Sequence, residues 1–408
     1  MPEHLILLPT PPSKLEFSAF KAAYIPGLTK AITTILEQAE GPQKQILDVA
    51  VECINQSDRL PGRARNNLYS YAQHVTALLY RLTCQICAEK GISTQGPGSI
   101  DVRIVLLETI PDPSYGLLGS VRGPIFPLAE LATSSKLWRT IFHLATHFGY
   151  DLFLRFSRIR EVWNFPLPQL CSICEVPGGA SAQHSDHGTV YRTFDDKPHD
   201  QSNYSHTVVA VGGTWDHLHE GHKLLLSATA LVLNIQLRID RDRPVRLIVG
   251  ITGDELLVNK KYAEVMESWE DRQGAVVTFL SSIMSLSDDR KAIKNVVRFN
   301  EPGPNGTAIH YTFSNGVIVE CVKISDPFGP TITDESVTAL AISAETRAGG
   351  KAVNDKRGEK GWAPLEVFEV DVLDANAEKE SGDERSGNFQ SKISSTEIRR
   401  RLQEKQKL

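Results

Sequence analysis

The sequence lacks the features that mark membrane-spanning, secreted and nucleic-acid-binding proteins. No apolar run approaches the roughly 18–20 residues that a transmembrane helix needs. Six cysteines in 408 residues are too few for a disulfide framework, which favours a reducing compartment. The formal charge is −5, so no basic excess indicates binding to nucleic acid. We therefore expect a cytoplasmic protein that uses neither a membrane nor a nucleic acid.

The length and the order of apolar runs predict two α/β domains joined by a linker. At about 150 residues per domain, the chain is too long for one small module. Strand-like and helix-like stretches alternate over residues 1–175, which predicts an N-terminal α/β domain of unknown role. Residues 176–205 are rich in Gly, Ser, His and Asp without an apolar period, which is typical of a linker. Residues 206–408 form the second predicted domain.

Five continuous apolar runs predict the architecture of the second domain. They are rich in β-branched residues, as expected for strands that are buried on both faces of a parallel sheet. We therefore expect a Rossmann-like, doubly wound five-stranded parallel sheet that binds its ligand at the carboxyl ends of the strands. The predicted strands cover residues 206–213, 245–252, 317–324, 338–344 and 365–373.

The most informative segment is GGTWDHLHEGHKLLL, at 212–226, which follows an apolar strand and opens a predicted helix. Gly212 and Gly213 permit a tight turn and a close approach of the backbone to a ligand. The start of the helix supplies free N–H groups and the positive end of a helix dipole. The segment therefore predicts an anion-binding turn at the end of the first strand of this domain.

The same segment carries two histidines, His219 and His222, which share a face of the first helical turn. Gly221 between them leaves room for a phosphate beside the backbone. A metal site is the weaker interpretation, because the HExxH motif spaces its histidines four apart around a glutamate. The segment resembles the signature of the HxGH nucleotidyltransferase superfamily. That resemblance implies that Thr214 and both histidines contact a triphosphate, and that the histidines stabilise the α-phosphate as pyrophosphate leaves.

Two further segments resemble parts of the eukaryotic phosphopantetheine adenylyltransferases. The segment at 249–272 resembles the one in which a lysine grips the phosphate of the acceptor. Lys260 is the aligned residue and Lys261 the alternative, although an exposed basic pair on a loop is also a common arrangement. The segment ISDPFGPTITDES, at 324–336, resembles the DP(Y/F)GP stretch of these enzymes, which implies a role in shaping the pocket.

The segment ISAETRAGGKAVNDKRGEKG, at 342–361, resembles the S-x-E-T…GG…N-x-x-R segment of the same enzymes. The resemblance implies an arginine that contacts the phosphates of ATP. Such an arginine is expected directly before the paired glycines, where Ala348 stands here. Arg347 and Arg357 therefore both remain candidates, and an exposed basic helix is the structural alternative.

The segment SKISSTEIRRRL, at 391–402, resembles the ISST motif of the family. The resemblance implies that Ser394, Ser395 and Thr396 hold the nucleotide phosphates together with N–H groups at a helix start. The spacing of Ser394 and Glu397 also fits a capping box, which is a sufficient structural reason for the pattern.

These segments occur in order over most of residues 206–405, and the chain resembles the fungal-type pantetheine-phosphate adenylyltransferases. The resemblance implies transfer of AMP from ATP to 4′-phosphopantetheine, which gives dephospho-coenzyme A and pyrophosphate, with Mg²⁺ neutralising the triphosphate. It also implies a role in coenzyme A biosynthesis, with protein partners of that pathway. We expect no fused kinase activity, because the sequence holds no GxxxxGK[ST] string.

Two other interpretations of the second domain stay open. Another HxGH nucleotidyltransferase, such as a cytidylyltransferase or a nicotinate-type adenylyltransferase, would share the signature. The ISST and DPFGP segments weigh against both of these. A catalytically inactive nucleotide-binding scaffold is the other interpretation, and the displaced arginine is the sequence feature that favours it.

Weaker motifs elsewhere have the spacing of metal ligands. The pair Cys84–Cys87 lies in an apolar predicted helix, far along the chain from the pair Cys171–Cys174, which argues against a zinc ribbon. The histidines of FHLATHFG are four apart in a helix predicted over residues 137–149, but the Glu of HExxH is missing. We therefore assign no metal ligands.

Overall fold

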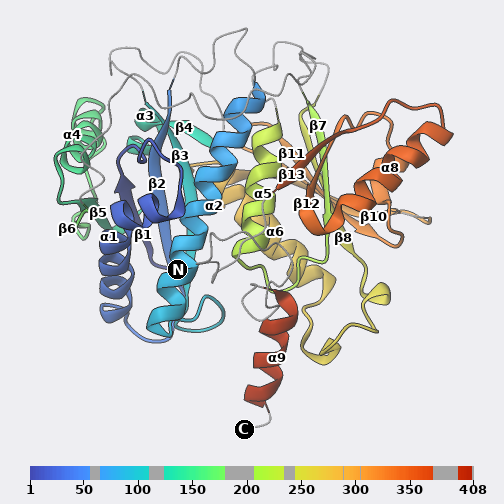
Figure 1. The fold of residues 1–408 in the computed structure, drawn as a ribbon, viewed down its shortest axis with the longest axis horizontal. Coiled ribbons are helices and arrows are strands. Elements are labelled where there is room, and N and C mark those ends of the chain that lie inside the picture. The colour runs from blue at the N-terminus through green and yellow to red at the C-terminus, as the bar shows by residue number, and fades with distance from the viewer. Residues whose placement is uncertain are drawn as a thin grey trace. The chain divides into compact units, whose positions relative to one another are not determined.

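The structure is a computed structural model that divides into two compact units (Figure 1). One unit is formed chiefly by Met1–Asn203 and the other chiefly by Tyr204–Leu408. No helix within the described ranges is long and apolar enough to cross a membrane. Residues 180–205, most of the predicted linker, lie outside the described residues. The structure describes residues 1–55, 65–109, 124–179, 206–233, 244–287, 289–303, 305–370 and 394–406.

The first unit contains a six-stranded parallel sheet with the strand order β4-β3-β2-β1-β5-β6. This order reverses between β1 and β5, as in doubly wound sheets. The core on one face joins residues of β1, β3 and β5 to apolar residues of α3 and α4. The strands are β1 (Glu3–Leu8), β2 (Gln45–Asn55), β3 (Ile100–Thr109), β4 (Ile125–Pro127), β5 (Trp138–Leu144) and β6 (Ser172–Val176). The helices are α1 (Phe17–Glu37), α2 (Arg65–Lys90), α3 (Leu128–Ala132) and α4 (His147–Val162).

The prediction of a helix over residues 137–149 is wrong. This segment forms the strand β5, and α4 begins only at His147, after Thr146 caps it by accepting the N–H of Gly149. Nearly all of β5 is buried, and a short apolar run of this kind cannot be told from a helix by its period alone. His143 is therefore on a strand, where its ring stacks on Phe153 with the centroids 4.5 Å apart.

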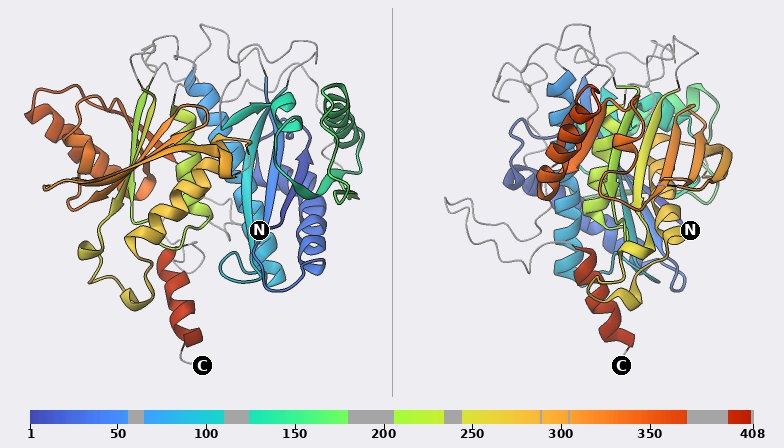
Figure 2. Two further views of the ribbon diagram at one scale, coloured as in Figure 1. Left: turned by 180° about the vertical axis from the view of Figure 1, so that it is seen from behind. Right: turned by 90° about the vertical axis from the view of Figure 1, so that its right-hand side faces the viewer.

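The second unit contains a seven-stranded mixed sheet with the order β13-β12-β7-β8-β11-β10-β9. The first five strands of this order are parallel and correspond to the five predicted runs. The prediction of five strands is two short, because an antiparallel pair, β9 and β10, extends one edge (Figure 2). The strands are β7 (Val208–Gly213), β8 (Arg246–Thr252), β9 (Ile293–Asn300), β10 (Thr307–Phe313), β11 (Ile318–Ile324), β12 (Ala339–Ser343) and β13 (Glu366–Val370).

The order of the parallel strands determines where a ligand can approach the second unit. The order reverses at β7 and β12, so the crevice outside their carboxyl ends is the expected ligand position. The turn between β7 and α5 and the start of α8 both lie at this edge of the sheet. The helices of the unit are α5 (Glu220–Val232), α6 (Trp269–Met284), α7 (Asp289–Ala292), α8 (Arg347–Glu359) and α9 (Ser395–Gln406).

Candidate active site

The turn between β7 and α5, residues 214–219, has an unusual backbone conformation. Trp215 and His217 both lie in the left-handed region, with φ of 59° and 47°. Residues other than glycine rarely adopt this conformation, and it persists only where the surrounding structure stabilises it. Contacts with other parts of the second unit hold this turn, which we call the signature turn, in its conformation.

Two contacts that hold the signature turn come from the neighbouring strand β8 and from the helix α6. The indole of Trp215 is buried and donates its Nε1–H to the carbonyl of Gly250, on β8, at 2.9 Å. The fully buried guanidinium of Arg272, on α6, donates to the carbonyl of Thr214 at 2.7 Å. Its other terminal nitrogen donates to the carboxylate of Asp254 at 2.5 Å. The side chain of Trp215 is thereby fixed to β8, and the carbonyl of Thr214 is fixed to α6.

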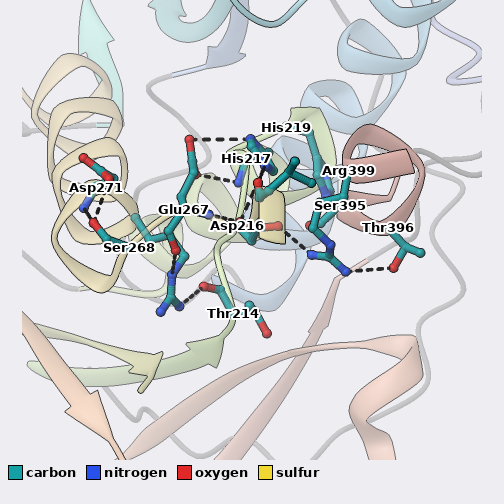
Figure 3. Close-up of polar contacts among 12 residues, drawn as sticks. Thr214, Asp216, His217, His219, Glu267, Ser268, Asp271, Ser395, Thr396 and Arg399 are labelled. Carbon is teal, nitrogen blue, oxygen red and sulfur yellow. Dashed lines mark hydrogen bonds and ion pairs between the residues drawn. The ribbon is translucent and has the colours of Figure 1, made fainter. Parts of the chain in front are cut away.

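A group of two carboxylates and one imidazole continues this network (Figure 3). Asp216 is buried and accepts the N–H of Glu267 at 3.0 Å and a guanidinium N–H of Arg399 at 2.5 Å. Glu267 in turn accepts the N–H of His217 at 2.7 Å. Atoms of Asp216, His217 and Glu267 lie within 4.8 Å of one another, which is a spacing that a cation could use. The charge of Arg399 and the two N–H groups already satisfy the carboxylates, so the group fits a support for the turn better than a metal site.

The two predicted histidines lie together at the start of α5. The rings of His219 and His222 stack with their centroids 3.9 Å apart and an angle of 18° between their planes. The Nε2 of His219 lies 3.4 Å from the hydroxyl of Ser395, the first residue of α9. A Cβ at Gly221 would lie 3.1 Å from the His219 ring, so the glycine lets this ring fold back over the start of the helix.

The environment of His222 keeps its imidazole neutral. Burial is the main reason why its pKa is lowered to about 4; Asp216 opposes this shift, and the neighbouring His217 adds to it. Its Nδ1 has no hydrogen-bond partner among the described residues. A phosphate that contacts this ring would favour the charged form and so raise the pKa. The ring therefore combines a low pKa with a buried Nδ1 that no described group contacts through a hydrogen bond.

This low pKa predicts a pH dependence of stability. Below pH 6.5 the unfolded chain binds a proton at His222 that the folded chain does not bind until about pH 4. The free energy of unfolding should therefore fall as the pH falls through this window, by at most about 1.4 kcal/mol per pH unit. Urea denaturation of the wild type and of His222→Gln across this range measures the effect. We expect a shallower pH dependence in the variant, and equal slopes would contradict the assignment.

The two predicted glycines that end β7, directly before the signature turn, have different surroundings. A Cβ at Gly213 would lie 2.9 Å from the indole of Trp215, so this glycine makes room for the buried ring. A Cβ at Gly212 would meet no atom of the described residues within 4 Å. The backbone at Gly212 is therefore open to a group from outside the chain, as an anion-binding turn requires.

The two candidate lysines lie in the loop after β8. Both Lys260 and Lys261 are exposed. The N–H of Lys260 donates to the carbonyl of Leu257 at 2.9 Å, and the carbonyl of Lys261 accepts from Arg399 at 3.0 Å. The backbone of this loop is thus fixed, while either ammonium group can extend into solvent, and the choice between them stays open.

The two candidate arginines lie in different environments. Arg347 begins α8 at the end of β12 and is exposed, with its guanidinium paired to Glu369 at 2.5 Å. Arg357 is 1% exposed, and all five of its N–H donors point to backbone carbonyls, which leaves none for a phosphate. Sequence reasoning missed this structural role, because the spacing of a motif does not show which arginine is buried. The carbonyls belong to Thr331, Asp334, Glu335, Val337 and Ala363.

The predicted capping box at the start of α9 forms in part. The N–H of Glu397 lies 3.4 Å from the hydroxyl of Ser394. The carboxylate of Glu397 turns away to accept from Arg400 at 2.7 Å and from Arg401 at 2.8 Å. The hydrogen bonds from these arginines, Arg400 first, hold the pKa of Glu397 at about 2. The structure places Thr396 against Arg399, whose guanidinium donates to its hydroxyl at 3.2 Å.

The second unit therefore brings together, at one edge of its sheet, features that α/β proteins use to bind anions. A glycine turn ends the first parallel strand, and two helix N-termini, those of α5 and α9, meet where His219 contacts Ser395. Helix N-termini attract negative charge, and two of them together favour a ligand with several phosphates.

Comparisons with known proteins add the family. Residues 1–182 match a family described as "Domain of unknown function (DUF8446)". The chain is 37% identical over 195 residues to the phosphopantetheine adenylyltransferase of Saccharomyces cerevisiae, a match that covers 48% of each chain. It is 30% identical over 165 residues to the phosphopantetheine adenylyltransferase of Thermococcus kodakarensis, a match that covers 40% of this chain and 74% of the relative.

The chain belongs to the phosphopantetheine adenylyltransferase family, which is a family of nucleotidyltransferases. The chain spans about half the length of the yeast relatives that it matches. The match to the first unit carries no description of its chemistry.

Proposed function

We propose that this protein transfers AMP from ATP to 4′-phosphopantetheine in coenzyme A biosynthesis. The observation that carries the proposal is the stacked pair His219 and His222 beside Ser395, where two helix N-termini meet. This arrangement suits a triphosphate, because it combines two imidazoles with the free backbone N–H groups of two helix starts.

The reaction needs positioning and charge stabilisation more than a nucleophilic side chain. An oxygen of the acceptor phosphate attacks the α-phosphorus of ATP, and the bond to pyrophosphate breaks, with no covalent enzyme intermediate. We assign the binding and stabilisation of the triphosphate to Thr214, His219 and His222. Lys260, or its neighbour Lys261, orients the acceptor phosphate.

The remaining residues of the proposed site hold the nucleotide. We assign Arg347 rather than Arg357 to the phosphates of ATP, because only Arg347 has an exposed guanidinium. Ser394, Ser395 and Thr396 contribute hydroxyl groups at the start of α9. We expect Mg²⁺ to enter with the triphosphate of ATP and to neutralise its charge, and we assign no protein ligand to it.

Assays of the full-length chain test this proposal. We expect dephospho-coenzyme A and pyrophosphate to form from ATP and 4′-phosphopantetheine. CTP, and nicotinate mononucleotide as the acceptor, should support at most a small fraction of this rate. A preference for CTP would identify a cytidylyltransferase, and tight ATP binding without product would identify a scaffold; either result overturns the proposal.

A further inference from the structure

One arginine of α9 differs from its neighbours in burial. The side chain of Arg399 is 4% exposed, whereas those of Arg400 and Arg401 are 43% and 69% exposed. In the described part of the chain, the exposed pair forms ion pairs with two glutamates of the same helix, Glu397 and Glu404. Arg399 instead makes its contacts with residues from other parts of the unit, apart from one hydrogen bond to Thr396.

The guanidinium of Arg399 joins three segments that lie far apart in the sequence (Figure 3). Its Nη1 donates to the carboxylate of Asp216, in the signature turn, at 2.5 Å. Its Nε donates to the carbonyl of Lys261, in the loop after β8, at 3.0 Å. Its Nη2 donates to the hydroxyl of Thr396, at the start of α9, at 3.2 Å. Each of these segments carries residues that we assign to the proposed site.

Because the ion pair of Arg399 and Asp216 is buried, we expect it to specify the position of α9 more than to add to the free energy of unfolding. The side chain of Asp216 is fully buried, so an unpaired charge there would cost several kcal/mol. The attraction between the two charges mainly offsets the cost of removing both from water. Its consequence is geometric: α9 can dock only where the guanidinium reaches the carboxylate.

The helical spacing of Ser395 and Arg399 means that the docking of α9 also sets the position of Ser395 beside His219. Ser395 precedes Arg399 by four residues, so both lie on one face of α9. When Arg399 is seated on Asp216, the hydroxyl of Ser395 lies 3.4 Å from the Nε2 of His219. Since α9 begins at Ser395, the same contact fixes the N-terminus of the helix over the signature turn.

We propose that Arg399 is a positioning residue. Through its ion pair with Asp216, it aligns the signature turn, the loop after β8 that carries Lys260 and Lys261, and the start of α9. This inference rests on the proposed adenylyl transfer, because those three segments carry the residues assigned to ATP and to the acceptor. It predicts that loss of Arg399 affects both substrates, although the guanidinium itself is occupied by protein groups.

Kinetics of full-length variants test the inference. The variants are Arg399→Met, Asp216→Asn and the double variant, with Arg401→Met as the matched control on the same helix. The double variant removes both charges, so it avoids the uncompensated carboxylate that could unfold Arg399→Met. We expect kcat/KM of the double variant to fall by about tenfold to a hundredfold, as a small misplacement can cause, with KM raised for ATP and for 4′-phosphopantetheine.

The pattern among the variants separates this role from others. We expect the double variant to be no worse than Asp216→Asn alone, because both changes break one pair, and Arg401→Met to match the wild type. Losses that multiply, or a rise in KM for ATP alone, would make Arg399 a direct ATP ligand and overturn the inference. Wild-type kinetics of the folded double variant would also overturn it. An inactive wild type would instead show that the proposed function has failed.

Discussion

Replacing His222 by alanine is expected to lower the turnover of adenylyl transfer by at least about a hundredfold. That is the usual cost of removing one group that stabilises charge in a transition state. His222 is suited to the role because its Nδ1 has no hydrogen-bond partner among the described residues and its ring is held between His219 and Trp215. Release of pyrophosphate under saturating ATP and acceptor measures the effect.

A second histidine of the same unit provides the control. The pKa of His310, on β10, is also lowered by burial, but its ring lies against that of Phe299, on β9, with the planes tilted by 50°. His310→Ala should therefore keep the wild-type turnover. If folded His222→Ala released pyrophosphate at nearly the wild-type rate, the assignment of this histidine to the transition state would be wrong.

The second large effect is expected at Arg357, and it concerns stability. Arg357→Met removes five N–H donors and leaves buried carbonyls of two segments without partners. An unsatisfied buried polar group costs about 1–3 kcal/mol, so we expect the free energy of unfolding to fall by about 3 kcal/mol or more. Urea denaturation gives this value, and KM for ATP, measured on the folded variant, should stay unchanged.

Arg347→Met is the matched variant on the same helix. The guanidinium of Arg347 is exposed, so water and salt screen its pair with Glu369 and the pair should contribute little to stability. We expect this variant to raise KM for ATP while the urea midpoint stays near that of the wild type. The reverse pattern, with Arg357 affecting KM and Arg347 affecting stability, would show that the nucleotide contact is assigned to the wrong arginine.

Burial decided which parts of the fold could be predicted from the sequence. Four of the five parallel strands of the second unit, β7, β8, β11 and β12, are mostly buried apolar runs, and such runs are recognisable without a partner. The strand β9 was missed because almost all of its residues are exposed, so it has no apolar period. The strand β5 was mistaken for a helix because its length and apolar content fit both.

The candidate site was predictable only where a local motif carries it. The spacing of His219 and His222 around a glycine predicts a helix start with two neighbouring rings, and the structure has this arrangement. The roles of Arg272 and Arg399 depend on partners far along the chain, and nothing in the sequence pairs them. Arg399 also lies in a run of three arginines, and only the docking of α9 shows which of them is buried.

The distance along the chain between Asp216 and Arg399 has a consequence for biosynthesis. The two residues are 183 positions apart, so the signature turn leaves the ribosome long before its counter-ion. Until Arg399 has been made, the carboxylate of Asp216 has no guanidinium to pair with, and burying it unpaired would be energetically unfavourable. Contacts of such long range form late in folding, because they close a large loop. A nascent chain therefore completes its signature turn only when α9 has been made, after all the strands of the sheet have been synthesised.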